Sequence, residues 1–320
     1  MINKAVEAIR GNSSFLITSH ISPDGDALGS ISALYTLLKK MGKEITIYLY
    51  DKIPAELSFL NGLDNITRVL PEKRHDVVIT VDCANLSRAG AELIQFENYG
   101  LLINVDHHKG NDNFGDINIV DKDICSTGML IYKIIKAADI EIDYDMAVAI
   151  YLTILVDSGS FHYSNASSEA FRIAAEMIDK GVNPWDVAEH VYENQPVSRI
   201  NLLKISLEQI ETFVDVGFAS MIVTRQMLKE TGATFDMTDG FINYPRSIHG
   251  IEIALLFKEI FPGRYKVSFR SKKSADVGSI AEQFGGGGHK NAAGCIIDGD
   301  MDKIKKKIFK SVESYLKGSV

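Results

Sequence analysis

Two kinds of apolar pattern alternate along the first part of the chain. Short continuous apolar runs, typical of buried strands, are separated by longer stretches in which apolar residues recur with helical spacing. Residues 26–41 are an example of the second kind, because Leu28, Ile31 and Leu34 share one helix face and Gly42 follows the last turn. Regular alternation of strands and helices predicts an α/β domain built on a doubly wound, mostly parallel sheet.

The predicted elements of this first domain cover most of its length. Strands are predicted at residues 14–19, 44–50, 77–81 and 101–105, and helices at residues 1–11, 26–41, 90–98, 127–138, 145–156, 168–180 and 184–194. A short helical piece bounded by Pro54 is expected between the second and third strands.

Gln195-Pro196 interrupts the pattern and predicts a domain boundary. We expect a first domain at 1–195, a helical linker at 196–212, and a smaller α+β domain at 213–320, with a cleft between the two domains. The second domain has predicted strands at 218–224, 251–257, 265–270 and 294–297, and predicted helices at 226–231, 276–284 and 301–316.

Length and composition fit this division. A chain of 320 residues favours two domains, and a hydrophobic content of 46% is enough for two cores. Three widely separated cysteines, with no CxxC pair, argue against a disulfide framework and against a cysteine zinc site. The N-terminus has no signal-peptide pattern and no apolar run approaches membrane-spanning length, so we expect a soluble cytoplasmic protein with no membrane partner.

The charge distribution argues against a large nucleic-acid surface but leaves room for a small anionic substrate. The net charge is −8, whereas non-specific nucleic-acid binding is usually accompanied by a basic domain. Residues 264–273 form a local exception, with five basic residues and no acid. A solvated strand face and an anion-binding surface both explain such a run.

Acids and histidines follow three of the predicted strands. His20 comes after the first strand, Asp82 after the third, and Asp106-His107-His108 after the fourth. The carboxyl ends of parallel strands share one rim of a sheet, and ligands bind at that rim. These side chains are therefore expected to meet.

The loop after the first strand has the composition of a cation site. It presents His20, Asp24 and Asp26 within seven residues, and Pro23 and Gly25 favour a turn. One imidazole with two carboxylates suits Mn²⁺ or Mg²⁺ better than structural zinc. Capping of the following helix by an aspartate is the alternative explanation.

A fourth segment presents Asp157, directly after the predicted helix at 145–156. The alternative explanation is that Asp157 only ends that helix. Four separated segments that each present Asp or His at the end of an apolar element are hard to explain by capping alone. The candidate ligands are His20, Asp24, Asp26, Asp82, His107 and Asp157. Their four carboxylates would balance two divalent cations, whereas a single ion would leave a charge of minus two.

Such a pair of metal ions, about 3.5–4 Å apart, lowers the pKa of a bridging water and clamps the oxygens of a phosphoryl displacement. Asp82, on a central strand, is the natural residue to bridge the two ions.

These segments resemble a known family. The patterns His20-x-x-x-Asp24-x-Asp26, Asp82, Asp106-His107-His108 and Asp157-Ser158-Gly159 are similar to the four motifs of the DHH phosphoesterase superfamily. The segment 285–294, with four glycines before His289, resembles the GGGH motif of the associated DHHA1 domain. Length and layout are similar to the NrnA-type oligoribonucleases (nanoRNases) and 3'-phosphoadenosine 5'-phosphate (pAp) phosphatases.

The resemblance implies a role for each motif residue in the first domain. His20, Asp24 and Asp82 would hold one Mn²⁺, and Asp26, Asp82, His107 and Asp157 the second. His108 would donate a proton or contact the substrate, and Asp106 would orient the histidines. Arg88 is expected to reach a phosphate.

In the second domain, the glycine run is open to two explanations. Glycine runs are usually flexible linkers, but this one lies between a predicted helix and a predicted strand, and glycines let backbone N–H groups approach a phosphate. By the resemblance, the substrate would be gripped over the metal centre by Arg270, Gly286, Gly287, Gly288 and His289.

The leading hypothesis is a two-metal, Mn²⁺-dependent phosphoesterase that degrades short RNA oligonucleotides to mononucleotides and dephosphorylates pAp. Cyclic di-AMP and the linear dinucleotides derived from it are the alternative substrates for the same site. A non-catalytic nucleotide-binding module is less compatible with a full set of metal ligands. Oligonucleotide length, direction of digestion and oligomeric state, with a homodimer as one candidate, are left open by the sequence.

Overall fold

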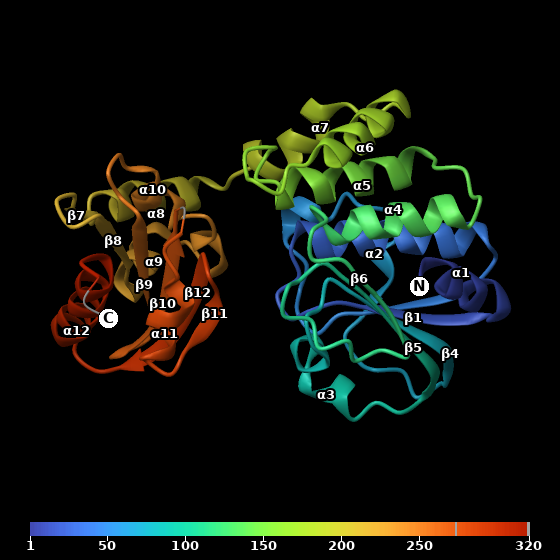
Figure 1. Cartoon of the computed structure of the whole chain (residues 1–320), viewed down its shortest axis with the longest axis horizontal. Coiled ribbons are helices and arrows are strands. Elements are labelled where there is room, and N and C mark those ends of the chain that lie inside the picture. The colour runs from blue at the N-terminus through green and yellow to red at the C-terminus, as the bar shows by residue number, and fades with distance from the viewer. Residues whose placement is uncertain (273, 319–320) are drawn as a thin grey trace. The chain divides into compact units, whose positions relative to one another are not determined.

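The computed structural model describes residues 1–272 and 274–318, which form two compact units, Met1–Asn194 and Gln195–Val320 (Figure 1). Each unit has its own six-stranded sheet and its own hydrophobic core. Lys273, in the basic run, lies outside the described residues, and so does the side chain of His289. The predicted fold class, α/β in the first part and α+β in the second, is confirmed.

The sheet of the first unit is parallel throughout its described pairings. The strand order is β3-β2-β1-β4-β5-β6. The strands are β1 (Ser14–Thr18), β2 (Glu44–Tyr48), β3 (Ile66–Thr67), β4 (His75–Val81), β5 (Tyr99–Asp106) and β6 (Ile117–Val120). The strand order reverses between β1 and β4, because β2 and β3 extend the sheet on one side of β1 and β4, β5 and β6 extend it on the other. Sheets of this kind bind ligands at such a switch point.

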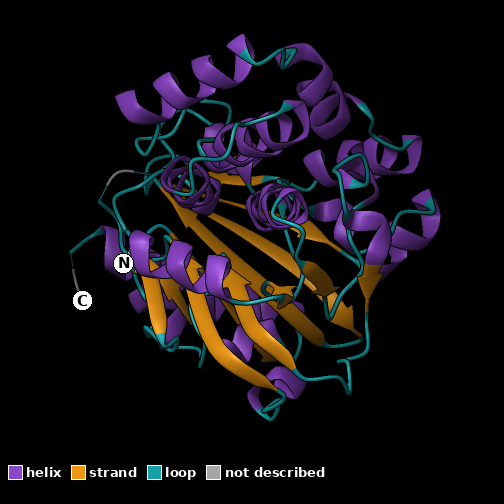
Figure 2. Cartoon of the chain, turned by 90° about the vertical axis from the view of Figure 1, so that its right-hand side faces the viewer, coloured by secondary structure: helices purple, strands orange, loops and turns teal. Residues whose placement is uncertain are grey.

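Helices cover one face of this sheet far more thickly than the other (Figures 1 and 2). The thick layer contains α1 (Ile2–Gly11), α2 (Gly25–Lys40), α4 (Thr127–Ala137) and α5 (Tyr144–Asp157), with α6 (Ser168–Asp179) and α7 (Pro184–Ala188) packed outside α5. The other face is covered by the 3₁₀ turn Leu86–Ala89 and by α3 (Ala91–Ile94). The helix predicted at 90–98 is therefore a single turn.

Two glycines let three helices of the thick layer approach closely. A Cβ atom on Gly29 of α2 would lie 2.6 Å from Cγ2 of Thr153 in α5, and a Cβ atom on Gly128 of α4 would overlap the same threonine side chain. Real Cβ contacts this short do not occur, so no larger residue fits at either position without a shift of a helix.

The sheet of the second unit is mixed, with the order β11-β12-β10-β9-β8-β7, and only the β8–β9 pair is parallel among those described. The strands are β7 (Glu211–Phe213), β8 (Phe218–Val223), β9 (Ile253–Phe261), β10 (Arg264–Ser271), β11 (Gly287–His289) and β12 (Ala292–Asp298). One face packs on α11 (Val277–Glu282) and α12 (Met301–Leu316). The other packs, around Met221 and Leu256, on α8 (Val197–Leu207), α9 (Arg225–Thr231) and α10 (Asn243–Ser247).

The segment predicted as a helical linker differs from its prediction. Helix α8 ends at Leu207, and residues 211–213 form β7, which pairs with β8. Leu202 of α8 is fully buried in the core of the second unit, so α8 packs as part of that unit. Within the described residues, no helix combines the length and the apolar character needed to span a bilayer.

Candidate metal centre

The loop after β1 carries both the predicted cap and the predicted cation ligands. Oδ1 of Asp24 accepts hydrogen bonds from the backbone N–H groups of Asp26 and Ala27, each at 3.1 Å, so Asp24 is the N-cap of α2. The same oxygen lies 4.0 Å from Nε2 of His20. The capping explanation for Asp24 is thus correct, and it is compatible with a second role for the same carboxylate.

Asp26 is held by a helix other than its own. Its two carboxylate oxygens accept hydrogen bonds from the backbone N–H groups of Thr127 (2.8 Å) and Gly128 (3.1 Å), the first two residues of α4. The N-cap residue Ser126 makes no side-chain cap, so Asp26 satisfies these N–H groups in its place. Asp26 is only 1% exposed and its orientation is fixed from both oxygens.

Asp82 lies between the other candidate ligands. It follows β4 with φ of 55°, a left-handed conformation that aspartate tolerates better than most residues. Its Oδ2 lies 3.4 Å from Nε2 of His20, whereas its Oδ1 lies 3.6 Å from Nε2 of His107. The hydroxyl of Thr127 also donates to Oδ1, at 3.0 Å. The two oxygens of one carboxylate therefore face two different histidines.

His107 joins Asp82 to the end of α5. Its Nε2 is 3.3 Å from Oδ2 of Asp157, the last residue of α5, and 3.6 Å from Oδ2 of Asp26. His107 comes directly after β5, so the end of a strand, the end of α5 and the first turn of α2 meet at this imidazole.

Three overlapping groups of side chains could hold metal ions. Within each group the ligand atoms lie within 4.8 Å of one another. The groups are His20, Asp24 and Asp82; Asp26, His107 and Asp157; and Asp82, His107 and His108. The structure thus brings together all six predicted metal ligands and His108, at the carboxyl ends of β1, β4 and β5.

The charges of this centre fit divalent cations. Burial, followed by the negative charges of Asp82, Asp157 and Asp24, raises the pKa of Asp26 well above its usual value. Burial and neighbouring carboxylates likewise raise the pKa of Asp157. Burial would also raise the pKa of Asp82, but the hydrogen bond from His20 and the nearby histidines outweigh it and lower that pKa to about 2. Cations would relieve the repulsion among these carboxylates.

His108 turns toward a different partner from His107. Its Nδ1 lies 2.7 Å from Oδ1 of Asp106. Burial alone would lower the pKa of His108, but the hydrogen bond to Asp106 and the charge of Asp82 outweigh burial and raise that pKa. The exposed Arg88 opposes this effect through its positive charge, which places the guanidinium within electrostatic range of His108.

The predicted substrate residues of the second unit lie on its sheet. Arg270 is on β10, and Gly287 and Gly288 belong to β11. Gly286 and Gly288 have a packing reason to be glycine, because a Cβ atom on either would overlap backbone or side-chain atoms of β12. The glycine segment is therefore a paired edge strand. The predicted role of these glycines in phosphate binding stays a prediction.

Lys258 is a candidate residue that the sequence reasoning missed. It lies opposite Lys266 in the β9–β10 register, so it shares a sheet face with Lys266 and with Arg270, four residues further along β10. Its Nζ donates to Oγ1 of Thr238 at 3.1 Å and lies 4.6 Å from the ring centroid of Phe235. The sequence feature that could have identified Lys258 is its position as the only lysine in the largely apolar segment of β9.

Burial, together with the charges of Lys266 and Arg270, lowers the pKa of Lys258 to about 8. Beside this cationic face, a hollow of about 370 Å³ is lined by Lys266, Ile296 and backbone near Gly286 and Gly294.

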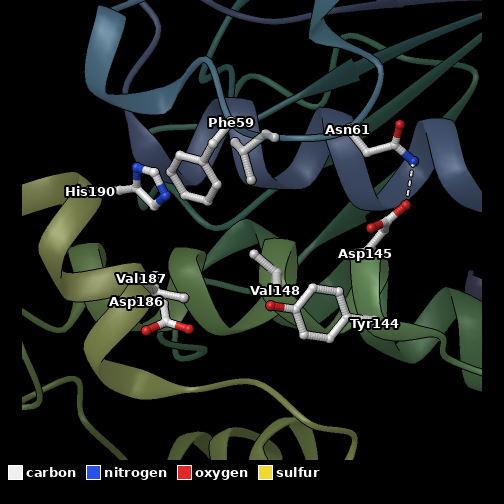
Figure 3. Close-up of a pocket in the computed structure, with 9 residues that line it drawn as sticks. Phe59, Asn61, Tyr144, Asp145, Val148, Asp186, Val187 and His190 are labelled. Carbon is white, nitrogen blue, oxygen red and sulfur yellow. Dashed lines mark hydrogen bonds between the residues drawn. The ribbon is translucent and has the colours of Figure 1, made fainter.

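A separate pocket of about 110 Å³ lies at the opposite end of α5 (Figure 3). Phe59 stacks on His190 at one side, and Asn61 donates to Asp145 at 2.9 Å on the other. Asp145 lies in the first turn of α5 and Asp157 ends that helix, so about 20 Å of helix separates this pocket from the metal centre. None of the predicted site residues lines it.

Comparison with protein families accounts for both units. Residues 14–168 match the model of the DHH family, N-terminal domain, and residues 218–318 match the model of the DHHA1 domain. The chain therefore carries a DHH-family N-terminal domain followed by a DHHA1 domain, and DHH phosphoesterases are metal-dependent.

Individual relatives resemble the chain over nearly its whole length. It is 29% identical to the bifunctional oligoribonuclease and PAP phosphatase NrnA of Thermus thermophilus, over 99% of this chain and 94% of the relative. It is 26% identical to the NrnA protein of Bacillus subtilis, over 93% of each chain. The crystal structure of an exopolyphosphatase-related protein from Bacteroides fragilis superimposes with a TM-score of 0.93, at 27% identity, over 99% of this chain and 96% of that one.

Proposed function

We propose that this protein is a Mn²⁺-dependent phosphoesterase that hydrolyses short oligoribonucleotides to mononucleotides and dephosphorylates pAp. The observation that carries the proposal is the set of three overlapping Asp and His clusters, two of which share Asp82 and two of which share His107. The relatives named as bifunctional oligoribonucleases and PAP phosphatases support the choice of substrates.

Two Mn²⁺ ions per chain are part of the proposal. The cluster of His20, Asp24 and Asp82 would hold one ion, and the cluster of Asp26, His107 and Asp157 the other. Asp82 would be shared, because its Oδ1 lies 3.6 Å from Nε2 of His107. Mixed imidazole and carboxylate donors suit Mn²⁺. When bound, such a pair would supply an activated water and charge stabilisation for phosphoryl displacement.

The protein's own groups supply the remaining chemistry. His108 belongs to the cluster with Asp82 and His107, and its hydrogen bond to Asp106 raises its pKa, so it is suited to give a proton to the leaving oxygen. Arg88 is exposed near His108 and would bind a phosphate oxygen of the substrate.

The second unit would bind the nucleotide part of the substrate. The protein has a net charge of −8, so attraction for an oligonucleotide must come from locally placed cations. Arg270, Lys258 and Lys266 share one sheet face, and backbone N–H groups of the glycine segment lie on neighbouring strands. We assign this face, with Gly286–Gly288 and His289, to substrate binding.

The test is a substrate series with purified protein and Mn²⁺. We expect release of mononucleotides from 5'-labelled and 3'-labelled RNAs of two to five residues, phosphate release from pAp, and loss of both activities after chelation. Strong preference for cyclic di-AMP over these substrates would replace the proposal with a cyclic dinucleotide phosphodiesterase. No hydrolysis of any phosphoester by metal-loaded protein would refute it.

A variant pair tests the assignment of the second unit. Arg270→Ala is expected to lower kcat/KM on dinucleotides and pAp by at least about ten-fold, because a charged hydrogen bond contributes about 1.5–3 kcal/mol. Hydrolysis of a small activated phosphodiester should change little. Arg264→Ala, on the same strand but near Asp298, is the matched control and should behave as wild type. Equal losses with both substrates would place Arg270 in the chemical step.

A further inference from the structure

A connected set of asparagines lies behind His108. Nδ2 of Asn104 donates to Oδ1 of Asn111 at 2.8 Å and lies 3.0 Å from Oδ1 of Asn118. Asn104 is fully buried within β5. None of the three asparagines is among the candidate metal ligands, so their mutual hydrogen bonds call for another explanation.

This set ends at the carboxylate that holds His108. Nδ2 of Asn111 donates to Oδ2 of Asp106 at 2.6 Å, while Oδ1 of Asp106 lies 2.7 Å from Nδ1 of His108. Asp106 is fully buried, and a buried carboxylate is costly unless hydrogen-bonded. Each oxygen of Asp106 thus has a different partner, and the plane of the carboxylate is fixed from both sides.

His108 has an alternative arrangement within reach. Its Nδ1 is also 3.6 Å from Oδ1 of Asp82, and the imidazole forms a metal-competent group with Asp82 and His107. A small rotation would therefore take the ring from Asp106 to the metal ligands. A histidine that binds a metal ion through Nδ1 cannot donate a proton from that nitrogen.

We propose that Asn111 is a positioning residue that, by fixing Asp106, keeps His108 out of the metal-ligand set and in the tautomer protonated on Nδ1. His108 then keeps Nδ1 on Asp106 instead of on a metal ion, and in its doubly protonated form it can give the proton on Nε2 to the leaving oxygen. The catalytic part of this inference rests on the proposed function, since it concerns the protonation of a leaving oxygen. The structural part, the tautomer of His108, is independent of activity.

Two isosteric variants separate this role from general stabilisation of the loop. Asn111→Asp keeps the acceptor for Asn104 but removes Nδ2, which donates to Asp106 at 2.6 Å and also contacts the carbonyl of Cys83 and Oδ1 of Asn104. Asn118→Asp makes the same chemical change one link away and leaves Asp106 with its partner, because Nδ2 of Asn118 donates to the carbonyl of Gly115. Both variants add one negative charge, but only Asn111→Asp places it against Asp106.

The first measurement is imidazole ¹⁵N NMR of metal-free protein, with the His108 signals assigned by a His108→Gln variant. Wild type and Asn118→Asp should show His108 protonated on Nδ1, and Asn111→Asp should lose that signature. If Asn111→Asp does not fold, Asp106→Asn is the second variant, because an amide at this position would donate to Nδ1 and impose the other tautomer. An unchanged tautomer in the folded variant would overturn the inference.

The second measurement compares two substrates with the metal-loaded enzymes. On a dinucleotide, whose leaving sugar oxygen needs a proton, Asn111→Asp should lower kcat by about 10–100-fold, as for other residues that orient a functional group. On the p-nitrophenyl ester of uridine 5'-phosphate, whose leaving group needs no proton, kcat should be nearly unchanged. Equal losses on both substrates would refute a positioning role for Asn111. Failure of wild type on both would refute the proposed function and leave the NMR result standing.

Discussion

Replacement of Asp82 by alanine tests whether one carboxylate serves both metal sites. Oδ2 of Asp82 faces His20 and Oδ1 faces His107, so each oxygen belongs to a different cluster. Removal of a single side chain should therefore empty both sites. Asp157→Ala should empty only one, because Asp157 belongs to a single cluster.

The size of the effect follows from linkage between binding and folding. A metal ion present at 100 times its Kd stabilises the folded protein by about 2.7 kcal/mol, and two ions by about 5 kcal/mol. For a unit of the size of Met1–Asn194, 1 kcal/mol corresponds to about 2–4 °C in Tm. Wild type should thus gain about 10–20 °C on addition of Mn²⁺, Asp157→Ala about half of that, and Asp82→Ala almost nothing.

The assay combines elemental analysis of dialysed protein with thermal unfolding in Mn²⁺ or in chelator. Each variant is compared with its own chelated form, which removes the effect of the lost hydrogen bond from Thr127. Asp145→Ala, at the other end of α5, is the control and should retain two ions. One ion retained by Asp82→Ala, with half the wild-type shift in Tm, would show that Asp82 is not shared.

Three further predictions concern single side chains. His107→Ala should lose metal, whereas His108→Ala should keep both ions and lose about two to four orders of magnitude in kcat, measured on a dinucleotide; reversed metal contents would exchange the two roles. Lys258→Met should raise the free energy of unfolding at pH 7 by up to about 3 kcal/mol, because the folded state disfavours the charged amine. Denaturant titrations should show that this gain in the free energy of unfolding shrinks as pH rises from 8 toward 10.5. In metal-free protein, the raised pKa of Asp26 makes the folded state bind more protons than the unfolded state, so wild type should gain stability relative to Asp26→Asn as pH is lowered toward the ordinary aspartate pKa of about 3.9; a stability difference that does not change with pH would contradict the assignment.

The meeting of acids and histidines at the strand ends could be predicted from the sequence, because apolar runs mark the strands locally and the alternation of strands with helices predicts a parallel sheet. Runs that end at His20, Asp82 and Asp106 lie side by side once the sheet is parallel, so their meeting follows from topology. The hydrogen bonds from Thr127 and Gly128 to Asp26 could not be anticipated. They join positions about a hundred residues apart, and no local pattern encodes that pairing.

The strands that sequence reasoning missed depend on their partners. Residues 287–289 have no strand propensity of their own, and they form β11 because glycines permit close approach to β12. Residues 211–213 continue an apolar pattern that predicts a helix, but pairing with β8 ends the helix at Leu207. Tertiary contacts decide both cases, and local pattern alone cannot reveal them.

The close packing of Gly29 and Gly128 against Thr153 has a consequence for how mutations in this gene would be interpreted. A methyl group at either glycine would push apart helices that carry Asp26, Asp157 and the N–H donors to Asp26. In a genetic screen, such an allele would lose activity like a substitution in the metal centre, although the altered residue offers no metal-binding side chain. A second-site change of Thr153 to alanine should suppress such an allele only in part, because Cβ of residue 153 would still lie 2.6 Å from a methyl group at Gly128, and the carbonyl oxygen of Ala149 would still lie 2.8 Å from one at Gly29.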